Sequence, residues 1–144
     1  MSTRTLTAAD TAQALTLYRH LVGDQLLASG AAFADLLDHP GTFVWGAFEA
    51  DHLLAMATLH ILPNMTQGGR PYALVENVVT HPEYRGTGQG RRVMQAVIDA
   101  AWAADCYKIM LLTGRSAEAR GFYEKLGFGA DEKWGMTIRR APVR

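Results

Sequence analysis

Three glycines at alternating positions separate an apolar strand from a helix in the middle of this chain, and this feature constrains the fold most. The strand is expected over Tyr72–Thr80 and the helix over about Gly88–Asp105, with glycine at positions 86, 88 and 90 where they meet. Glycine leaves its own N–H group unobstructed, and amides at the start of a helix favour an anion. The segment from His81 to Arg92 therefore predicts a phosphate-binding loop.

Two widespread phosphate-binding motifs do not fit this segment. The P-loop ends in Gly-Lys-Ser or Gly-Lys-Thr, whereas Gly90 is followed by Arg91. The dinucleotide fingerprint G-x-G-x-x-G needs a glycine at its sixth position, which is Arg91 counted from Gly86 and Val93 counted from Gly88. An ordinary glycine-rich connection that binds nothing remains the alternative.

The rest of the chain predicts one α+β domain over residues 1–144. Antiparallel strands come first and a β-α-β-α-β pattern follows, which together favour a mixed sheet. Apolar side chains alternate along two strands expected over Thr42–Glu49 and His52–Leu62. The other expected elements are a helix from Ala8 capped by Thr7, a helix over Ala32–Leu37, a strand over Tyr107–Thr113, a helix from the cap Ser116 through Lys125 ended by Gly127, and a last strand or hairpin at Phe128 and Lys133–Arg139.

Opposite charges balance over the whole chain but not within its halves. The chain has 14 basic and 14 acidic residues, which gives no support to a nucleic-acid or membrane-surface partner. Residues 1–84 carry a net charge of −5 and residues 85–144 a net charge of +5, so the basic half contains the glycine loop. A single cysteine, Cys106, and the lack of a signal-peptide or membrane-spanning run lead us to expect a cytoplasmic protein.

Two motifs in the second half resemble the Gcn5-related N-acetyltransferase (GNAT) family. Arg85-x-x-Gly88-x-Gly90 after an apolar strand is similar to the family's coenzyme A pyrophosphate signature. The runs beginning at Cys106 (Cys-Tyr-Lys-Ile-Met) and Phe122 (Phe-Tyr-Glu-Lys-Leu-Gly-Phe) resemble its next strand, helix and turn. The resemblance implies a twisted mixed sheet with splayed central parallel strands, flanked by about four helices.

The resemblance also implies an acyl donor and the residues that hold it. The donor would be acetyl-coenzyme A, with its pyrophosphate on the glycine loop and its pantetheine arm along the backbone of the first splayed strand. Many family members have an asparagine near the start of the last helix, where this chain has Ser116. The expected cofactor-binding residues are Val78, Val79, Thr80, Arg85, Gly86, Thr87, Gly88, Gln89, Gly90, Arg91 and Ser116.

Acetyl transfer to an amine needs a neutral amine, donors for the oxyanion and a proton for the departing thiolate. We expect Tyr123 to be the general acid, with a core aromatic as the alternative role. Glu76 is the candidate base, because a carboxylate buried on an apolar strand would have a raised pKa; a solvated or ion-paired glutamate is the alternative. Strand alternation puts Asn77 on the face opposite Glu76. The N–H group of Val78 is the first choice of oxyanion donor.

The acceptor is an unidentified primary amine. Family members that act on aminosugar phosphates resemble this chain through Glu76, but they usually have aspartate where Asn77 stands. A peptide or protein amine is a further option, and a noncatalytic acyl-coenzyme A sensor is the rival function. No histidine spacing indicates a metal ligand set, so no metal is expected. A homodimer would be ordinary for this family.

Overall fold

The structure is a computed structural model that describes residues 1–140. The chain forms two compact units, one from Met1 to Leu111 and one that begins at Leu112. The first unit contains the sheet and three of the α-helices, and the second contains the last α-helix. A single domain over residues 1–144 therefore stays a prediction.

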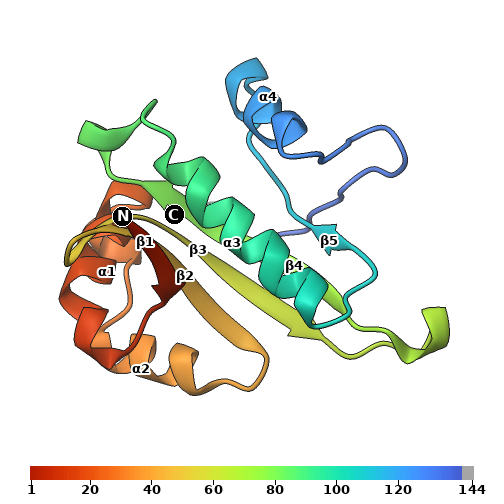
Figure 1. Ribbon diagram of the computed structural model, residues 1–144, viewed down its shortest axis with the longest axis horizontal. Coiled ribbons are helices and arrows are strands. Elements are labelled where there is room, and N and C mark those ends of the chain that lie inside the picture. Colours follow the sequence, from red (N-terminus) through yellow and green to blue (C-terminus); the bar gives the residue numbers. More distant parts are fainter. Residues whose placement is uncertain (141–144) are drawn as a thin grey trace. The chain divides into compact units, whose positions relative to one another are not determined.

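The first unit is built on one five-stranded sheet in the order β1-β2-β3-β4-β5 (Figure 1). Neighbouring strands from β1 to β4 are antiparallel, and β4 and β5 are parallel. Three of the strands have the bounds expected from the sequence. The strands are β1 (Ser2–Thr5), β2 (Thr42–Glu49), β3 (His52–Leu62), β4 (Tyr72–Thr80) and β5 (Ile109–Met110).

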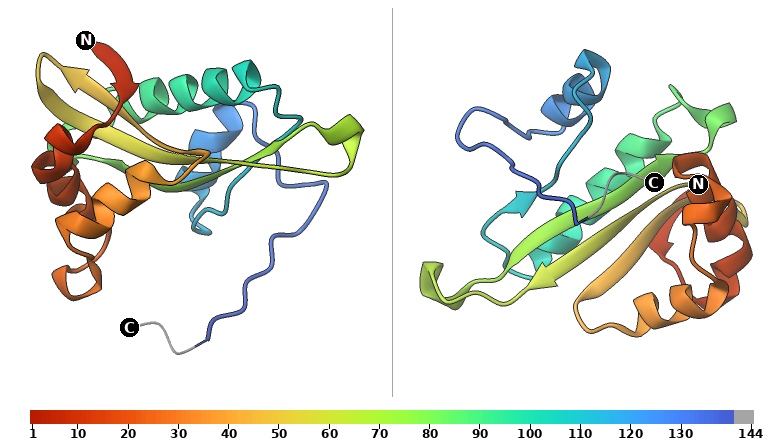
Figure 2. Two further views of the ribbon diagram at one scale, coloured as in Figure 1. Left: turned by 90° about the horizontal axis from the view of Figure 1, so that it is seen from below. Right: turned by 180° about the vertical axis from the view of Figure 1, so that it is seen from behind.

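Helices cover both faces of this sheet. In the view of Figure 2 that looks along the sheet, α3 lies on one face and α1 and α2 lie on the other. Buried side chains of α3 at Val93, Met94 and Val97 recur at helical spacing toward the strands. On the opposite face Leu17, Phe33, Phe48 and Met56 belong to one buried apolar cluster. The helices are α1 (Thr11–Leu21), α2 (Gly30–Asp38) and α3 (Gln89–Ala103).

The second unit contains α4 (Ala117–Lys125), whose two ends follow the sequence expectation. The Ser116 hydroxyl accepts a hydrogen bond from the Ala119 N–H group at 3.2 Å, as expected of a helix cap. Gly127 ends the helix with a φ of +101°, a conformation that favours glycine.

Several element predictions were wrong. The first helix begins with a 3-10 turn over Ala8–Asp10, and α2 is longer than expected. The expected strand over Tyr107–Thr113 shortens to Ile109–Met110, because only Ala73 and Leu74 of β4 pair with it. Residues 133–139 form no strand, since no neighbouring strand in the described part of their unit completes a ladder. Strand β1 was missed because its sequence, Ser-Thr-Arg-Thr, has no apolar alternation.

Replacing Asp10 with asparagine is expected to lower the free energy of unfolding at pH 7 by about 1–3 kcal/mol. The Asp10 side chain is buried and accepts hydrogen bonds from both terminal nitrogens of Arg4, at 2.8 and 2.9 Å, and from the Thr7 N–H group at 2.8 Å. The hydrogen bonds from Arg4 are the largest cause of the lowered pKa of Asp10. Denaturant unfolding at pH 7 measures the loss.

The same contact predicts a pH dependence of known sign. Because the folded state lowers the pKa of Asp10, its stabilisation is complete above the unfolded pKa of about 3.9 and is lost as the pH falls through the folded value. Asp10→Asn should therefore remove part of the acid-induced loss of stability. Asp35→Asn, a change of an exposed aspartate on α2, is the control. Equal stability of Asp10→Asn and the unsubstituted protein at pH 7 would contradict the prediction.

Candidate active site

The glycine loop joins β4 to α3 through the 3-10 helix η4 (Pro82–Tyr84). Gly86 and Gly88 have φ angles of +74° and +87°, and Gly88 is the residue immediately before α3. The Arg92 N–H group is bonded to the Gly88 carbonyl at 3.0 Å, so the three preceding helical amides have no acceptor within the helix. A Cβ atom added at either glycine would meet no heavy atom within 4 Å. The loop thus presents unpaired amides beside open space.

Side chains around this helix start add positive charge. Arg85 and Arg91 are exposed, and neither forms an ion pair with any residue from 1 to 140. Arg92 donates a hydrogen bond of 2.6 Å to the side chain of Gln89, which is buried. The Gln89 side-chain oxygen is therefore already engaged within the fold. Unpaired amides, open space and two exposed guanidinium groups together fit the pyrophosphate of coenzyme A.

The edge of β4 toward β5 is open over most of its length. Pairing with β5 is limited to Ala73 with Ile109 and Leu74 with Met110, near the start of β4. Beyond Leu74, no strand among the described residues lies along this edge, which runs on to the glycine loop. The expected pantetheine-binding residues lie at the free end: Val79 is buried, and Val78 and Thr80 are half-buried. A parallel pair that separates in this way leaves main-chain groups available to an extended ligand.

A β-bulge interrupts β4 beside the candidate base. Thr58 of β3 pairs with Glu76, and Met56 pairs with Val79, so two residues of β4 oppose the single residue Ala57. One of the two, Asn77, has a φ of +53°, which is uncommon outside glycine. The bulge is what ends the regular alternation of side chains in this strand.

The expected placement of Asn77 on the face opposite Glu76 was wrong. Of the two environments left open for Glu76, the structure shows the exposed one. Glu76 pairs with Thr58 of β3, and Thr58 pairs with Val44 of β2. Val44 belongs to the buried apolar cluster that also contains side chains of α1 and α2, so Glu76 lies on the face of the sheet that these helices cover. Asn77 lines a pocket bounded by α1 and α2 and therefore lies on the same face, not the opposite one. The bulge is the physical reason, because an extra residue reverses the alternation.

Tyr123 and Ser116 belong to the second unit. The Tyr123 ring is half-buried and packs edge-on against Phe122 and Phe128, with ring centroids 4.9 and 6.0 Å away. Burial raises the pKa of Tyr123 above its ordinary value. The Ser116 oxygen already accepts the capping hydrogen bond, which leaves its hydroxyl proton available as a donor.

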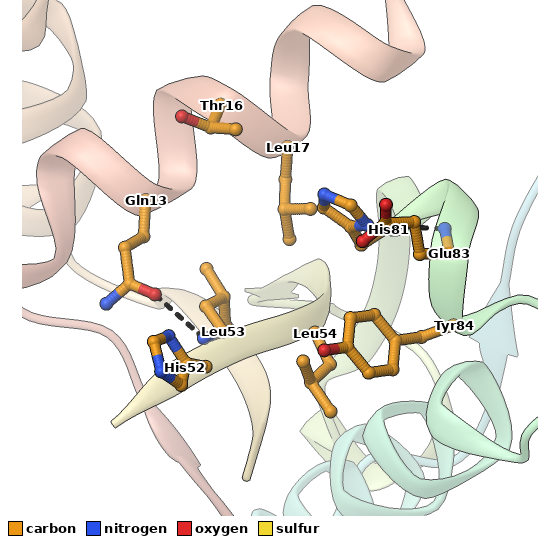
Figure 3. A pocket seen from close by; sticks show the side chains of 9 residues that line it. All are labelled: Gln13, Thr16, Leu17, His52, Leu53, Leu54, His81, Glu83 and Tyr84. Carbon is orange, nitrogen blue, oxygen red and sulfur yellow. Dashed lines mark hydrogen bonds between the residues drawn. The ribbon is translucent and has the colours of Figure 1, made fainter. Parts of the chain in front are cut away.

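Two pockets lie on the α1 side of the first unit. The smaller, of about 250 Å³, lies between α1, the start of β3 and η4 (Figure 3). Two of its polar side chains already bond to the fold: the Gln13 side-chain oxygen accepts from the Leu53 N–H group at 2.8 Å, and His81 Nδ1 accepts from the Glu83 N–H group at 3.3 Å. The larger pocket, of about 350 Å³, is the one that Asn77 lines. The family resemblance implies that residues 20–40 and the loop at 63–71 shape the acceptor pocket; nine of the twelve residues that line this pocket belong to the first segment and none to the second.

Three further features of the sequence concern the cysteine, metal ligands and membrane-spanning helices. Cys106 is buried and unbonded, and burial raises the pKa of its thiol. Among residues 1–140, no group of three histidine, cysteine or acidic side chains is placed to hold a metal ion. No helix in that range has the length and apolar character needed to cross a membrane.

Proteins of known family resemble this chain along most of its length. The family model described as "Acetyltransferase (GNAT) family" matches residues 7–128. Glucosamine 6-phosphate N-acetyltransferase of Trypanosoma brucei brucei is 34% identical over 135 residues, which cover 90% of each chain.

Solved structures agree with the sequence similarity. A protein of Agrobacterium tumefaciens strain C58, provisionally assigned as an acetyltransferase, is 43% identical, covers 97% of this chain and 100% of its own, and has a TM-score of 0.91. A Trypanosoma brucei acetyltransferase is 31% identical, with a TM-score of 0.80 and coverage of 96% of this chain and 99% of its own. A family match over more than half the chain, together with relatives similar over almost their whole length, shows that this chain belongs to the acetyltransferase (GNAT) family.

Proposed function

We propose that this acetyltransferase moves the acetyl group of acetyl-coenzyme A directly to a primary amine while both substrates are bound. The observation that carries the proposal is the continuity of β4 with the glycine loop. The strand has an open edge that runs toward the unpaired amides at the start of α3, and Glu76 lies on the same strand. A donor held at its pyrophosphate would therefore extend along the strand that bears the candidate base.

The roles proposed for the binding residues follow from their groups. The amides of Gly86, Gly88, Gln89, Gly90 and Arg91, with the guanidinium groups of Arg85 and Arg91, would hold the pyrophosphate. Main-chain groups of Val78, Val79 and Thr80 would bond the pantetheine arm, and the Ser116 side chain would add a hydroxyl group. The N–H and hydroxyl groups of Thr87 already donate to the Tyr84 carbonyl, so this residue would fix the shape of the loop. Acetyl-coenzyme A, when bound, supplies the acetyl group as a thioester, and coenzyme A leaves as the free thiol.

The roles proposed for the reacting groups need no nucleophilic side chain. Glu76 would accept a proton from the substrate ammonium group, directly or through water, and the neutral amine would then attack the thioester carbonyl. The Val78 N–H group would donate to the acyl oxygen as negative charge develops there. Tyr123 would give its proton to the departing sulfur.

An aminosugar phosphate is the first acceptor to assay. The relative from Trypanosoma brucei brucei is named for glucosamine 6-phosphate, and its similarity covers 90% of each chain. A peptide amine is the next acceptor class, and a noncatalytic acyl-coenzyme A sensor is the rival function. We keep a cytoplasmic location and a homodimer as expectations from the sequence and the family.

Gly88→Ala tests the loop on which the proposal rests. At a φ of +87°, a methyl group costs about 1–2 kcal/mol in strain and projects into the open space before the helix. Calorimetry should show that coenzyme A binds the unsubstituted protein and binds the variant about tenfold more weakly, a loss of one hydrogen bond to a charged group. Gly129→Ala adds a methyl group in open space where φ is ordinary, and it should leave the affinity unchanged.

Thiol release completes the test. Acetyl-coenzyme A is mixed with the protein and a panel of primary amines, and free thiol is measured. Release that depends on an amine supports the proposed function. Tight coenzyme A binding with no release against the whole panel would favour the sensor, and no coenzyme A binding at millimolar ligand would remove the proposal altogether.

A further inference from the structure

The larger pocket of the first unit is formed by α1, α2 and the segment between them, with Asn77 of β4 at its wall. Its volume of about 350 Å³ is at the small end of the range for ligand sites, about 300–1,000 Å³. Nine of its twelve lining residues are aliphatic residues, alanines or a phenylalanine, and the other three are Tyr18, Ser29 and Asn77. A compact apolar group is the ligand that this lining suits.

The rim of the pocket consists of apolar side chains that are partly exposed to solvent. Leu21, Val22 and Leu26 line it and are 41%, 36% and 45% exposed. Contiguous exposed apolar surface beside a cavity is typical of a ligand or partner site. Each square ångström of this surface that a ligand covers is worth about 25 cal/mol. Covering the rim with an apolar group of a ligand would therefore stabilise the complex.

Charge argues against a phosphate in this pocket. None of its lining residues is arginine, lysine or histidine. Arg19, near the end of α1, is engaged with Asp24 at 3.1 Å and does not line the pocket. A phosphate moved from water to an uncharged apolar site loses its hydration without gaining a partner. The described residues of this pocket thus favour an acceptor without phosphate.

The pocket also lies next to the candidate base. Asn77 follows Glu76 directly, and the bulge puts both on the face that bears the pocket. The side chain of Glu76 is exposed and has no ion-pair partner among residues 1–140. If the apolar part of an amine occupied the pocket, its ammonium group would lie on the side of the pocket where Asn77 and the Glu76 carboxylate are found. The Tyr18 ring also lines the pocket and is buried, with its hydroxyl beside that of Thr58 in the sheet.

We propose that this pocket holds the apolar body of the acceptor, so that the enzyme acetylates small primary amines bearing a compact aliphatic or aromatic group in preference to aminosugar phosphates. The inference rests on the proposed function, since it names the acceptor class of the same site. Asn77 and the exposed residues between α1 and α2 are its specificity determinants. Glu76 takes the proton from the amine as before, and the bonds made and broken are those of the proposed acetyl transfer.

The first experiment compares 2-phenylethylamine with glucosamine 6-phosphate as acceptors in the thiol-release assay. An apolar group in a matched pocket is worth about tenfold or more in kcat/KM, so 2-phenylethylamine should be the better acceptor by at least that factor. Equal or better turnover of glucosamine 6-phosphate would overturn the inference and leave the proposed function standing. No release with any amine would overturn both.

A pair of substitutions on α2 tests the pocket itself. Ala32 is exposed and lines the pocket, so Ala32→Trp should fill it and raise the KM for 2-phenylethylamine about tenfold. Ala31 is also exposed but does not line it, so Ala31→Trp is the matched control for folding and for surface hydrophobicity. The affinity for coenzyme A should be unchanged in both variants. Equal KM values in the two variants would overturn the assignment of the pocket.

Discussion

Replacing Tyr123 with phenylalanine is expected to lower kcat about a hundredfold, because the departing thiolate then loses its positioned proton donor. The substitution removes one oxygen atom and keeps the ring that packs between Phe122 and Phe128, so the second unit should retain its fold. Stopped-flow or steady-state thiol release measures kcat, and calorimetry measures the affinity for coenzyme A, which should not change. Tyr107→Phe, the same change at a tyrosine outside the proposed site, is the control.

The pH dependence of this variant separates an acid from a packing role. Burial raises the pKa of Tyr123 above its ordinary value of about 10, so the phenol stays protonated through neutral and mildly alkaline pH. In the unsubstituted enzyme the Tyr123 contribution should therefore fall only as the pH rises past that raised value. Tyr123→Phe should lack this alkaline decline. A loss of less than about twofold in kcat, or an unchanged alkaline decline, would assign Tyr123 to packing alone.

The regular part of the first unit could be predicted because its signals are local. The bounds of β2, β3 and β4 follow from short apolar runs that end at turn residues. The start of α3 was predictable from Gly88, whose positive φ few other residues adopt. Ser116 and Gly127 likewise carry their helix-end geometry in their own chemistry. In each case the local sequence determines the structure without a contact from a distant part of the chain.

Elements that depend on a neighbour were missed or wrongly extended. Strand β1 consists of Ser-Thr-Arg-Thr and is a strand because β2 offers it a free edge, a fact that its own side chains do not encode. The opposite error occurs at Trp134, Met136 and Ile138, which alternate as a strand would and yet are exposed in a segment without a ladder. Apolar alternation predicts a strand only where a partner strand is within reach.

In the candidate site, too, some residues could be predicted from local signals and others depended on distant partners. The glycine loop was predictable because its glycines and arginines act through their own backbone and charge. The bulge at Asn77 was not, since asparagine tolerates a positive φ but does not require one. One inserted residue then moved Asn77 to the face of Glu76 and placed it in the wall of the apolar pocket. The place of Asn77 in the wall of the proposed acceptor pocket therefore had to come from the structure, whereas the loop proposed to bind the donor was predicted from the sequence.

Replacing Glu76 with glutamine is expected to lower kcat about a hundredfold at pH 7, because a primary amine is then almost fully protonated and must lose a proton before it attacks. Glutamine keeps the shape of the side chain on an exposed strand position, so β4 should keep its pairing with β3. Glu83→Gln, the same change at an exposed glutamate in η4, should leave turnover unchanged.

The decisive measurement is how the loss in Glu76→Gln varies with pH. A base is needed only while the amine carries a proton, so the ratio of the two kcat values should approach one as the pH nears the pKa of the acceptor, about 10 for an alkylamine such as lysine. A glutamate that merely attracted the ammonium group would act differently: its loss would appear in the KM for the amine and not in kcat. A hundredfold loss that stays constant with pH would thus exclude proton transfer to Glu76. A loss that disappears at alkaline pH would tie the exposed carboxylate beside the bulge to the chemical step.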